Sequence, residues 1–386
     1  MIYHQASGVT LHQGDALSVL AGLPERSVQC IVTSPPYFQK RDYGIPPSVL
    51  GGDRECNHHW GAPERQWGAA VEGGRFCERC GAWLGTLGNE GTVEGYVQHL
   101  VEVCRALWRV LRNDGTLWLN IADSYSGSGK GPTGRGGIGD QARRQGFVGT
   151  SRHSPPGLKP KDLMLIPYRA AIALQANGWY VRSGITWAKR SCLPESVRDR
   201  PTSSTEMIWL LTKGERYLYD RQAVREASTP KQEAHNRRYA REYAFGLQEP
   251  GNGQPGNVNH RGLHSRPGPG GHALRNLWLL SPEPRRRDGD TAHHAAFPTE
   301  IPRRALKAGS RPGDLVLDPF VGSGTTAVVA RELVRECIGI DQKAEYLDIA
   351  IRRLARTVTP LPLPLPLPLP LPPPLRVPLP PPLEVG

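Results

Sequence analysis

The stretch DLVLDPFVGSGTTAVVARELVRE, residues 314–336, decides the fold. The apolar run ending at Asp318 predicts a buried strand, and AVVARELVRE predicts a helix. Between them, Gly322 and Gly324 allow the backbone to approach a ligand closely, and the start of the helix offers free N–H groups to a carboxylate or phosphate. A strand, a glycine turn and a helix in this order are typical of a nucleotide-type site.

The next apolar run, CIGID, ends at Asp341, about 20 residues beyond the turn, where the ribose-binding acid of a βαβ unit belongs. With Ala327 in third place the glycines also match a dinucleotide fingerprint, so a dehydrogenase is an alternative. After Asp341, however, only one helix (343–356) precedes a Leu/Pro tail, so no second half of that fold can follow. The remaining strands must come from earlier in the chain. No Lys follows Gly324, which excludes a Walker loop here.

Earlier segments supply those elements. VQCIV (28–32) predicts a strand, and apolar residues at helical spacing over 97–111 predict a helix that turns at 113–115 into the strand TLWLNIA. A helix over MLIPYRAAIALQANGW then precedes the strands YVRSGITWA and EMIWLLT. Helices that alternate with strands indicate an α/β fold with a mainly parallel sheet.

The VQCIV strand ends in Thr33-Ser34-Pro35-Pro36-Tyr37. Taken alone, SPPY is a rigid turn of a kind found in many proteins. Here it occurs together with DPFVGSGTT, and each motif follows its own strand. We therefore expect both to face one crevice at the carboxyl edge of the sheet.

TSPPY, followed far downstream by FPTEIPRRAL and DPFVGSGTT, resembles the β group of amino-methylating DNA methyltransferases, in which the catalytic loop precedes the cofactor turn. The resemblance runs from Val9 to Arg356. It implies a Rossmann-like, S-adenosylmethionine-dependent methyltransferase fold with a circularly permuted motif order, and a catalytic domain over 1–357.

The resemblance also implies the catalytic roles. A base amine is a poor nucleophile because its lone pair is delocalised, so acceptors must draw its nitrogen toward tetrahedral geometry. Ser34 Oγ and the Pro35 carbonyl have that task in the family, Pro36 keeps the loop rigid, and Tyr37 stacks on the flipped base. C5 methylation of cytosine would need a thiolate that follows a proline, and none of the seven cysteines does.

Ser in the first position favours N4 of cytosine by family habit, and Asp would favour N6 of adenine. Both side chains only accept hydrogen bonds from the amine, so adenine stays an alternative. An alternative of another class is a catalytically inactive, zinc-bearing DNA-binding protein.

The resemblance places S-adenosylmethionine around Asp318, Phe320, Gly322, Gly324 and Thr325, with Asp341 on the ribose hydroxyls. It places Asp15 at the adenine edge and Thr299 at the methionine end. For Asp15 and Thr299, helix capping is an alternative role.

Between the catalytic loop and the helix at 97–111, an insert over 51–92 carries CNHHW and CERCGAW. Cys56, His58, Cys77 and Cys80 suit tetrahedral structural Zn²⁺, and His59 could replace His58. The alternative is free thiols and a surface histidine.

Lys and Arg number 48 against 36 Asp and Glu, a formal charge of +12 that favours a polyanionic partner such as double-stranded DNA. Arginines and aromatics alternate over 227–275, the candidate target-recognition loop, although a solvated insertion would look similar. The Leu/Pro-rich tail, 358–386, is expected to be disordered.

The odd number of cysteines and the absence of an export signal or a long apolar run indicate a cytoplasmic protein of a prokaryote or phage. No membrane segment is expected. The resemblance leaves room for a cognate restriction endonuclease as partner.

Overall fold

A computed structural model of the chain describes residues 1–39, 44–53, 55–64, 73–127, 154–192, 195, 197–227, 271–282 and 297–357. The expected recognition loop lies outside these residues except at its two ends, and the Leu/Pro tail lies entirely outside them. Among the described helices, none is both long and apolar enough to span a membrane.

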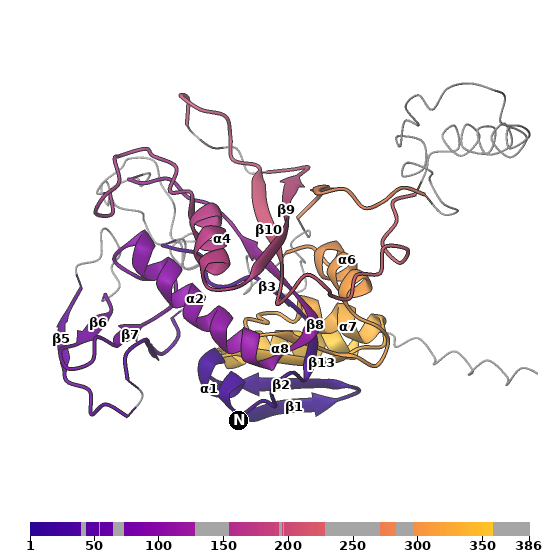
Figure 1. Cartoon of the computed structure of the whole chain (residues 1–386), viewed down its shortest axis with the longest axis horizontal. Coiled ribbons are helices and arrows are strands. Elements are labelled where there is room, and N and C mark those ends of the chain that lie inside the picture. Colours follow the sequence, from indigo (N-terminus) through magenta and orange to yellow (C-terminus); the bar gives the residue numbers. More distant parts are fainter. Residues whose placement is uncertain are drawn as a thin grey trace, which may run out of the picture.

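One large mixed sheet forms the centre of the described fold (Figure 1). In spatial order its strands are β1 (Ile2–Ala6), β2 (Val9–Gln13), β13 (Glu336–Asp341), β12 (Leu315–Asp318), β3 (Val28–Thr33), β8 (Leu111–Ile121), β10 (Thr205–Thr212), β9 (Tyr180–Lys189) and β11 (Leu277–Leu280). The pairs β1–β2, β8–β10 and β9–β10 are antiparallel and the other neighbours are parallel. The predicted α/β class with a mainly parallel sheet is confirmed.

Helices cover both faces of this sheet and bury two apolar clusters against it. On one face lie α1 (Ala16–Ala21), α2 (Val93–Val110) and α4 (Ile166–Ala176). On the other lie α6 (Glu300–Gly309), α7 (Thr325–Glu332) and α8 (Ala344–Ala355). Fully buried side chains such as Leu107 of α2 and Val329 of α7 anchor the two layers.

The turn expected at 113–115 is not a separate connection. Helix α2 leads directly into β8 at Leu111, and the pairing with β3 moves from Val28–Leu111 to Cys30–Thr116. Because β8 advances five residues while β3 advances two, the extra residues form a bulge whose side chains at Arg112 to Asp114 are exposed. The polar sequence is thus accommodated within the strand.

A second, smaller sheet lies between β3 and α2 in the chain. Its antiparallel strands, in the order β4 (Ser48–Leu50), β7 (Trp83–Gly85), β6 (Arg75–Cys77) and β5 (Trp60–Pro63), lie beside α2 and away from the large sheet (Figure 1). The first of these strands in the chain, β4, begins at Ser48, three residues before the start of the insert predicted over 51–92.

The permuted motif order has a simple structural consequence. The N-terminal strand β3 pairs in parallel with the C-terminal strand β12, through Cys30–Val316 and Ile31–Leu317. Two parallel neighbours end at the same edge of a sheet. The SPPY loop after β3 and the glycine turn after β12 therefore leave the sheet side by side. The strands missing after Asp341 are supplied by earlier segments of the chain, as predicted.

Asp318 joins these two loops. One carboxylate oxygen accepts hydrogen bonds from Thr33 Oγ1 (2.7 Å) and Phe320 N (3.1 Å), and the other accepts from Thr326 Oγ1 (2.6 Å). The side chain is 1% exposed, and burial raises the pKa of its carboxyl to about 6 despite these donors. Asp318 thus ties the end of β3, the turn and the start of α7 together.

This buried carboxyl predicts a pH-dependent stability. Because its folded pKa lies above the unfolded value, the folded chain holds the proton more tightly, so stability falls as pH rises from about 4 to about 6. In Asp318→Asn, the loss of unfolding free energy between about pH 5 and about pH 7.5 should shrink by about 1 kcal/mol. Urea unfolding at the two pH values measures this, and an unchanged difference would contradict it.

Candidate functional site

A cleft opens at the sheet edge where the two loops meet, with an empty volume of about 1150 Å³ that includes its open mouth. Ser34, Pro35, Pro36 and Tyr37 all line it. From the predicted cofactor set, so do Asp15, Asp318, Phe320, Gly322, Thr325 and Asp341. The structure therefore brings the proline loop and the glycine turn to one cleft, as expected from the sequence.

Asp341, at the end of β13, contacts the backbone of the glycine turn. Its carboxylate accepts hydrogen bonds from Gly322 N (3.0 Å) and Lys343 N (2.8 Å). Burial raises the pKa of this carboxyl to about 6, although both N–H groups stabilise its charged form. An acceptor group at the end of β13 is the arrangement that can receive hydroxyl donors of a ligand.

Gly324 packs closely against α8, and its predicted contact with the cofactor stays a prediction. It has a φ of +81°, and a Cβ at this position would lie 2.6 Å from Ala350 Cβ. It is not among the residues that line the cleft. The absence of a side chain at Gly324 therefore permits close packing of the turn against α8, whereas Gly322 lies at the cleft itself.

Asp15 caps a helix and also lines the cleft, and its contact with the adenine edge stays a prediction. Its Oδ1 accepts from Ser18 N (2.9 Å) and caps α1, while its Oδ2 accepts from Ser48 Oγ (2.7 Å) at the cleft. Thr299 precedes α6, but its side chain neither caps the helix nor lines the cleft. Phe297 of the same segment does line it, and the methionine contact of Thr299 stays a prediction.

Arg353 of α8 stabilises the glycine turn, a role that the sequence did not predict. Its Nη1 donates to Ser323 O (2.9 Å), Ser323 Oγ (3.0 Å) and Thr325 Oγ1 (2.9 Å). The residue stands in a basic helix, IRRLAR, where nothing distinguishes it from solvent-exposed arginines.

On the side of the large sheet, SPPY contacts a polar cluster that sequence reasoning missed. Ser34 Oγ donates to Tyr37 Oη (2.9 Å), which donates to Glu206 Oε2 (2.7 Å). Asn120 Nδ2 donates to both Tyr37 Oη (2.6 Å) and Glu206 Oε2 (2.9 Å), and Lys189 Nζ donates to Glu206 Oε1 (2.6 Å). A polar residue near the end of each of three adjacent strands was the available signal.

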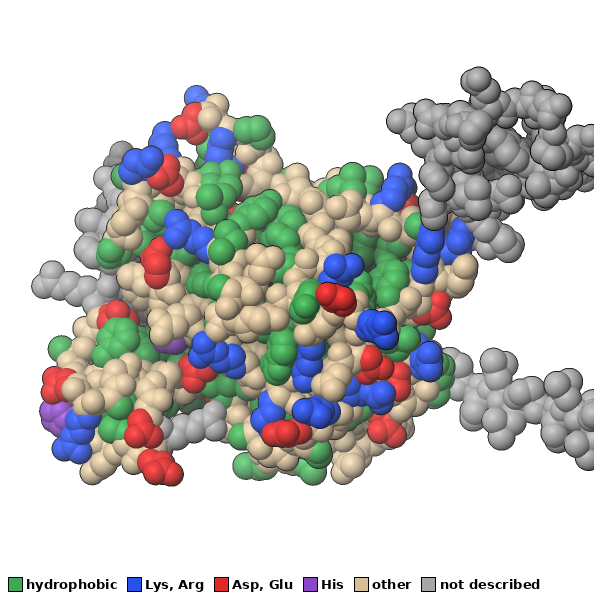
Figure 2. Space-filling model, in the orientation of Figure 1, with side chains coloured by type: hydrophobic (Ala, Val, Ile, Leu, Met, Phe, Trp, Pro, Cys, Tyr) green, Lys and Arg blue, Asp and Glu red, His purple; other side chains and the backbone are tan. Residues whose placement is uncertain are grey.

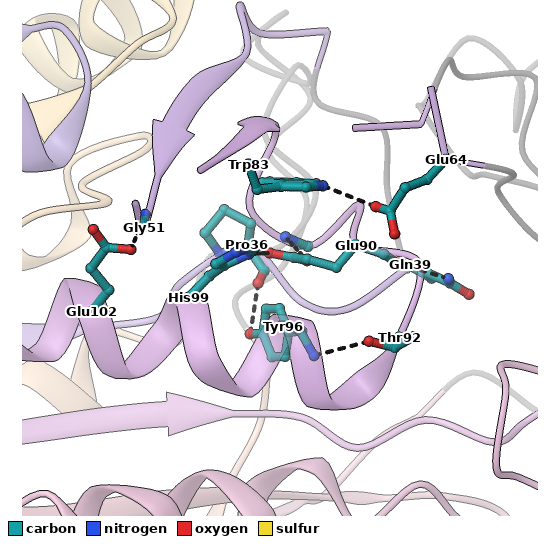
Figure 3. A network of polar contacts seen from close by, with 12 residues as sticks. Pro36, Gln39, Gly51, Glu64, Trp83, Glu90, Thr92, Tyr96, His99 and Glu102 are labelled. Carbon is teal, nitrogen blue, oxygen red and sulfur yellow. Dashed lines mark hydrogen bonds and ion pairs between the residues drawn. The ribbon is translucent and has the colours of Figure 1, made fainter. Parts of the chain in front are cut away.

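On its other side, the loop is held by α2 and the segment before it (Figure 3). Tyr96 Oη donates to the Pro36 carbonyl (2.8 Å), and Gln39 N donates to Gly88 O (2.7 Å). Gly88 N in turn donates to Glu90, whose carboxylate pairs with His99 of α2 (3.0 Å). Among the described residues none donates to the Pro35 carbonyl, which stays available to a ligand.

The four predicted metal ligands come together in the small sheet. The ligand atoms of Cys56, His58, Cys77 and Cys80 all lie within 4.8 Å of one another. Cys56 Sγ lies 4.0 Å from Cys77 Sγ, and Cys80 Sγ lies 3.4 Å from His58 Nδ1. Tetrahedral zinc with bonds of about 2.3 Å to sulfur separates two thiolates by about 3.8 Å, so the set fits that ion.

His59 does not belong to this cluster. Its Nδ1 pairs with Glu78 at 2.8 Å, and its side chain is 65% exposed. Within the cluster, burial raises the pKa of the Cys77 thiol, but hydrogen bonds from the backbone of Cys80 and Arg79 outweigh it and lower that pKa to about 5. Cys77 therefore favours the thiolate, the form that binds metals, whereas burial and hydrogen bonds with Cys80 and Cys77 raise the pKa of the Cys56 thiol to about 11.

Basic residues do not gather into one patch on the face drawn in Figure 2. There, Lys and Arg side chains of the described residues stand among Asp and Glu. The positive charge of the chain thus marks no single DNA-binding surface on this face, and most of the arginine-rich segment at 227–275 lies outside the described residues.

Comparison with known proteins identifies the family. A family model described as DNA methylase, for N6 and N4 enzymes, matches residues 28–352. The chain is 37% identical over 350 residues to the Type II methyltransferase M.Cfr9I of Citrobacter freundii, covering 91% of this chain and 89% of the relative. It is 38% identical over 344 residues to M.SmaI of Serratia marcescens, covering 89% of each.

A solved structure shares the fold. The PvuII DNA methyltransferase, described as cytosine-N4-specific, aligns with a TM-score of 0.53 and 17% identity over 92% of this chain and 90% of that one. This likeness supports the methyltransferase fold inferred from the permuted sheet, and the sequence matches give the family. The chain belongs to the N6/N4 DNA methylase family and is a DNA methyltransferase of the amino-methylating type.

Proposed function

We propose that the chain transfers a methyl group from S-adenosylmethionine to N4 of cytosine in double-stranded DNA. The observation that carries this proposal is the single cleft lined by Ser34, Tyr37 and Gly322. A methyl donor held on the glycine turn and an amine held on the proline loop would meet in it, and alignment of the two reactants is a large part of catalysis.

The residues of the cleft fit the donor. Asp341 would accept hydrogen bonds from the ribose hydroxyls, Asp15 would contact the adenine edge, and Phe320 and Gly322 would lie against the rest of the molecule. S-adenosylmethionine supplies an electrophilic methyl group on a sulfonium. The buried carboxylates Asp318 and Asp341 add negative charge beside a cationic ligand, which favours its binding.

The catalytic loop would hold the amine. Ser34 Oγ and the Pro35 carbonyl would accept its two N–H bonds and draw the nitrogen out of conjugation. The Pro36 carbonyl is already bonded to Tyr96, which fixes the loop and leaves the preceding carbonyl for the base. Tyr37 would stack on a base flipped out of the duplex.

The choice of cytosine rests on Ser34 in the first position of the motif. Fold likeness to a cytosine-N4-specific enzyme at 17% identity carries no weight for the base. The Type II names of the relatives support a role in modification of a specific DNA sequence, with a cognate restriction endonuclease as the partner enzyme.

Nucleoside analysis tests the reaction and the base together. DNA incubated with the purified chain and S-adenosylmethionine should yield N4-methylcytosine by mass spectrometry. Ser34→Ala should slow methyl transfer roughly a hundredfold or more, because the amine loses an acceptor that orients it. Ser27→Ala, whose hydroxyl contacts Pro24 O outside the cleft, is the matched control and should be unaffected.

The outcomes separate the alternatives. N6-methyladenine in place of N4-methylcytosine would overturn the base assignment and leave the amino methylation standing. DNA binding without any methyl transfer by the wild-type chain would favour the inactive zinc-bearing DNA-binding protein instead.

We also propose that Cys56, His58, Cys77 and Cys80 hold a structural Zn²⁺. The small sheet has short strands and few fully buried apolar side chains apart from Trp83, so a metal would supply stability that its core lacks. Four protein ligands would close the coordination sphere, which suits a structural ion.

Elemental analysis tests the metal. The purified chain should contain about one zinc per molecule, and Cys77→Ser should lose it because a tetrahedral site needs all four ligands. Exchange of backbone amide hydrogens in β5, β6 and β7 should then accelerate. His59→Ala is the matched control and should keep the zinc, since this residue faces Glu78. Zinc-free wild-type protein with slow exchange in these strands would rule the site out.

A further inference from the structure

Methylation of an amine releases a proton, and this proton needs an acceptor. When the nitrogen lone pair forms the new N–C bond, the nitrogen gains a positive charge until it loses one hydrogen. An amine conjugated to a ring is a weak base, so its methylated cation is a strong acid, and even an ion-paired carboxylate can accept its proton. The proposed function names Ser34 at the amine but names no group that takes the proton away.

The cluster behind the proline loop contains a continuous row of donors that ends on a carboxylate. Ser34 Oγ donates to Tyr37 Oη, and Tyr37 Oη donates to Glu206 Oε2, over 2.9 and 2.7 Å. Each hydroxyl can pass on its own proton while it receives another, because a hydroxyl is both donor and acceptor. Both distances lie in the range at which a general base acts.

We propose that Glu206 is the positioning carboxylate and final proton acceptor of the reaction, reached from the target amine through Ser34 and Tyr37. The proposal rests on the proposed function, since it needs the amine at Ser34. It gives the phenol of Tyr37 a second task beside stacking on the flipped base.

The amine lone pair forms the N–C bond while the C–S bond breaks and its electron pair stays on sulfur, leaving a neutral thioether. The amine proton moves to Ser34 Oγ, the Ser34 proton to Tyr37 Oη, and the Tyr37 proton to Glu206 Oε2. Glu206 becomes a neutral acid and returns its proton to water after the product leaves.

The surroundings of Glu206 suit this task. Its side chain is 10% exposed, and Lys189 pairs with the oxygen that does not face Tyr37. Lys189 places a positive charge beside the carboxylate, and Asn120 Nδ2 donates to the oxygen that faces the phenol. The three side chains come from adjacent strands, β8, β9 and β10, so the acceptor is held on rigid elements.

One buried acceptor of the cluster has no protein partner among the described residues. Asn120 is 2% exposed, and its Oδ1 is buried with no partner among the described residues. Buried polar atoms in folded proteins are almost always hydrogen-bonded, so an exception calls for an explanation. This carbonyl oxygen can accept a hydrogen bond from a water or from a donor of the substrate.

Single-turnover methylation by the full chain tests the relay. Glu206→Gln preserves size but cannot take up the proton, and Tyr37→Phe preserves the ring but interrupts the relay. Both should slow methyl transfer by roughly a hundredfold or more, the size of a general-base contribution. Dissociation constants for S-adenosylmethionine and for DNA should stay within about threefold of wild type. Neither substitution removes a proposed contact with either ligand in the complex that precedes methyl transfer.

The pH profile separates chemistry from structure. The titratable groups whose contacts with Glu206 the structure gives are Lys189 of β9 and Tyr37 of the loop, and Asn120 of β8 is uncharged. The wild-type rate should depend on pH through Glu206, which accepts the proton only in its charged form, and Glu206→Gln should lack this dependence. Glu94→Gln, which removes an exposed partner of Arg169, is the matched control and should keep both rate and profile.

The outcomes distinguish this inference from the function on which it rests. If Ser34→Ala is inactive while Glu206→Gln and Tyr37→Phe turn over within about threefold of wild type, the relay is wrong and the amine site stands. If Ser34→Ala is fully active, the amine site itself is wrong and the relay with it. Slow variants that keep the affinity for both ligands, together with the loss of the pH dependence in Glu206→Gln, support the relay.

Discussion

The parallel pairing of β3 with β12 is the constraint on which the site depends. It joins two strands nearly 300 residues apart in the chain, and it aligns their carboxyl ends so that both loops leave at one edge. Asp318 reinforces the junction, because its two oxygens accept hydrogen bonds from Thr33 before the proline loop and from Thr326 after the glycine turn. Burial of this carboxyl has an energetic cost, which those donors offset in part.

The proline loop is rigid because protein groups hold it from two directions. Prolines have no N–H, so the loop cannot stabilise itself through its own ladder of backbone bonds. Tyr96 binds the Pro36 carbonyl from α2, and Glu206 binds Tyr37 from the large sheet. A loop held between two fixed layers suits the proposed role, in which an amine must be kept at one distance from a methyl group.

The small sheet has a structural link to this loop. Trp83 of β7 stacks on His99 of α2 with ring centroids 4.7 Å apart, and His99 pairs with Glu90, which is bonded to the turn that contacts Gln39. Both members of the pair are buried, and burial raises the pKa of the Glu90 carboxyl. These contacts therefore connect the small sheet, through α2, to the end of the proline loop.

The sequence by itself determined the elements and the local motifs: the strand VQCIV before the proline loop, the strands ending at Asp318 and Asp341, the glycine turn, and the four Cys and His side chains that cluster. These follow from periodicity and from residues close together in the chain. Tertiary structure alone decided that Gly324 packs on Ala350, that Arg353 braces the turn, and that Glu206 stands behind Tyr37. Such contacts depend on the register and spacing of distant strands and helices, and no short stretch of sequence encodes them.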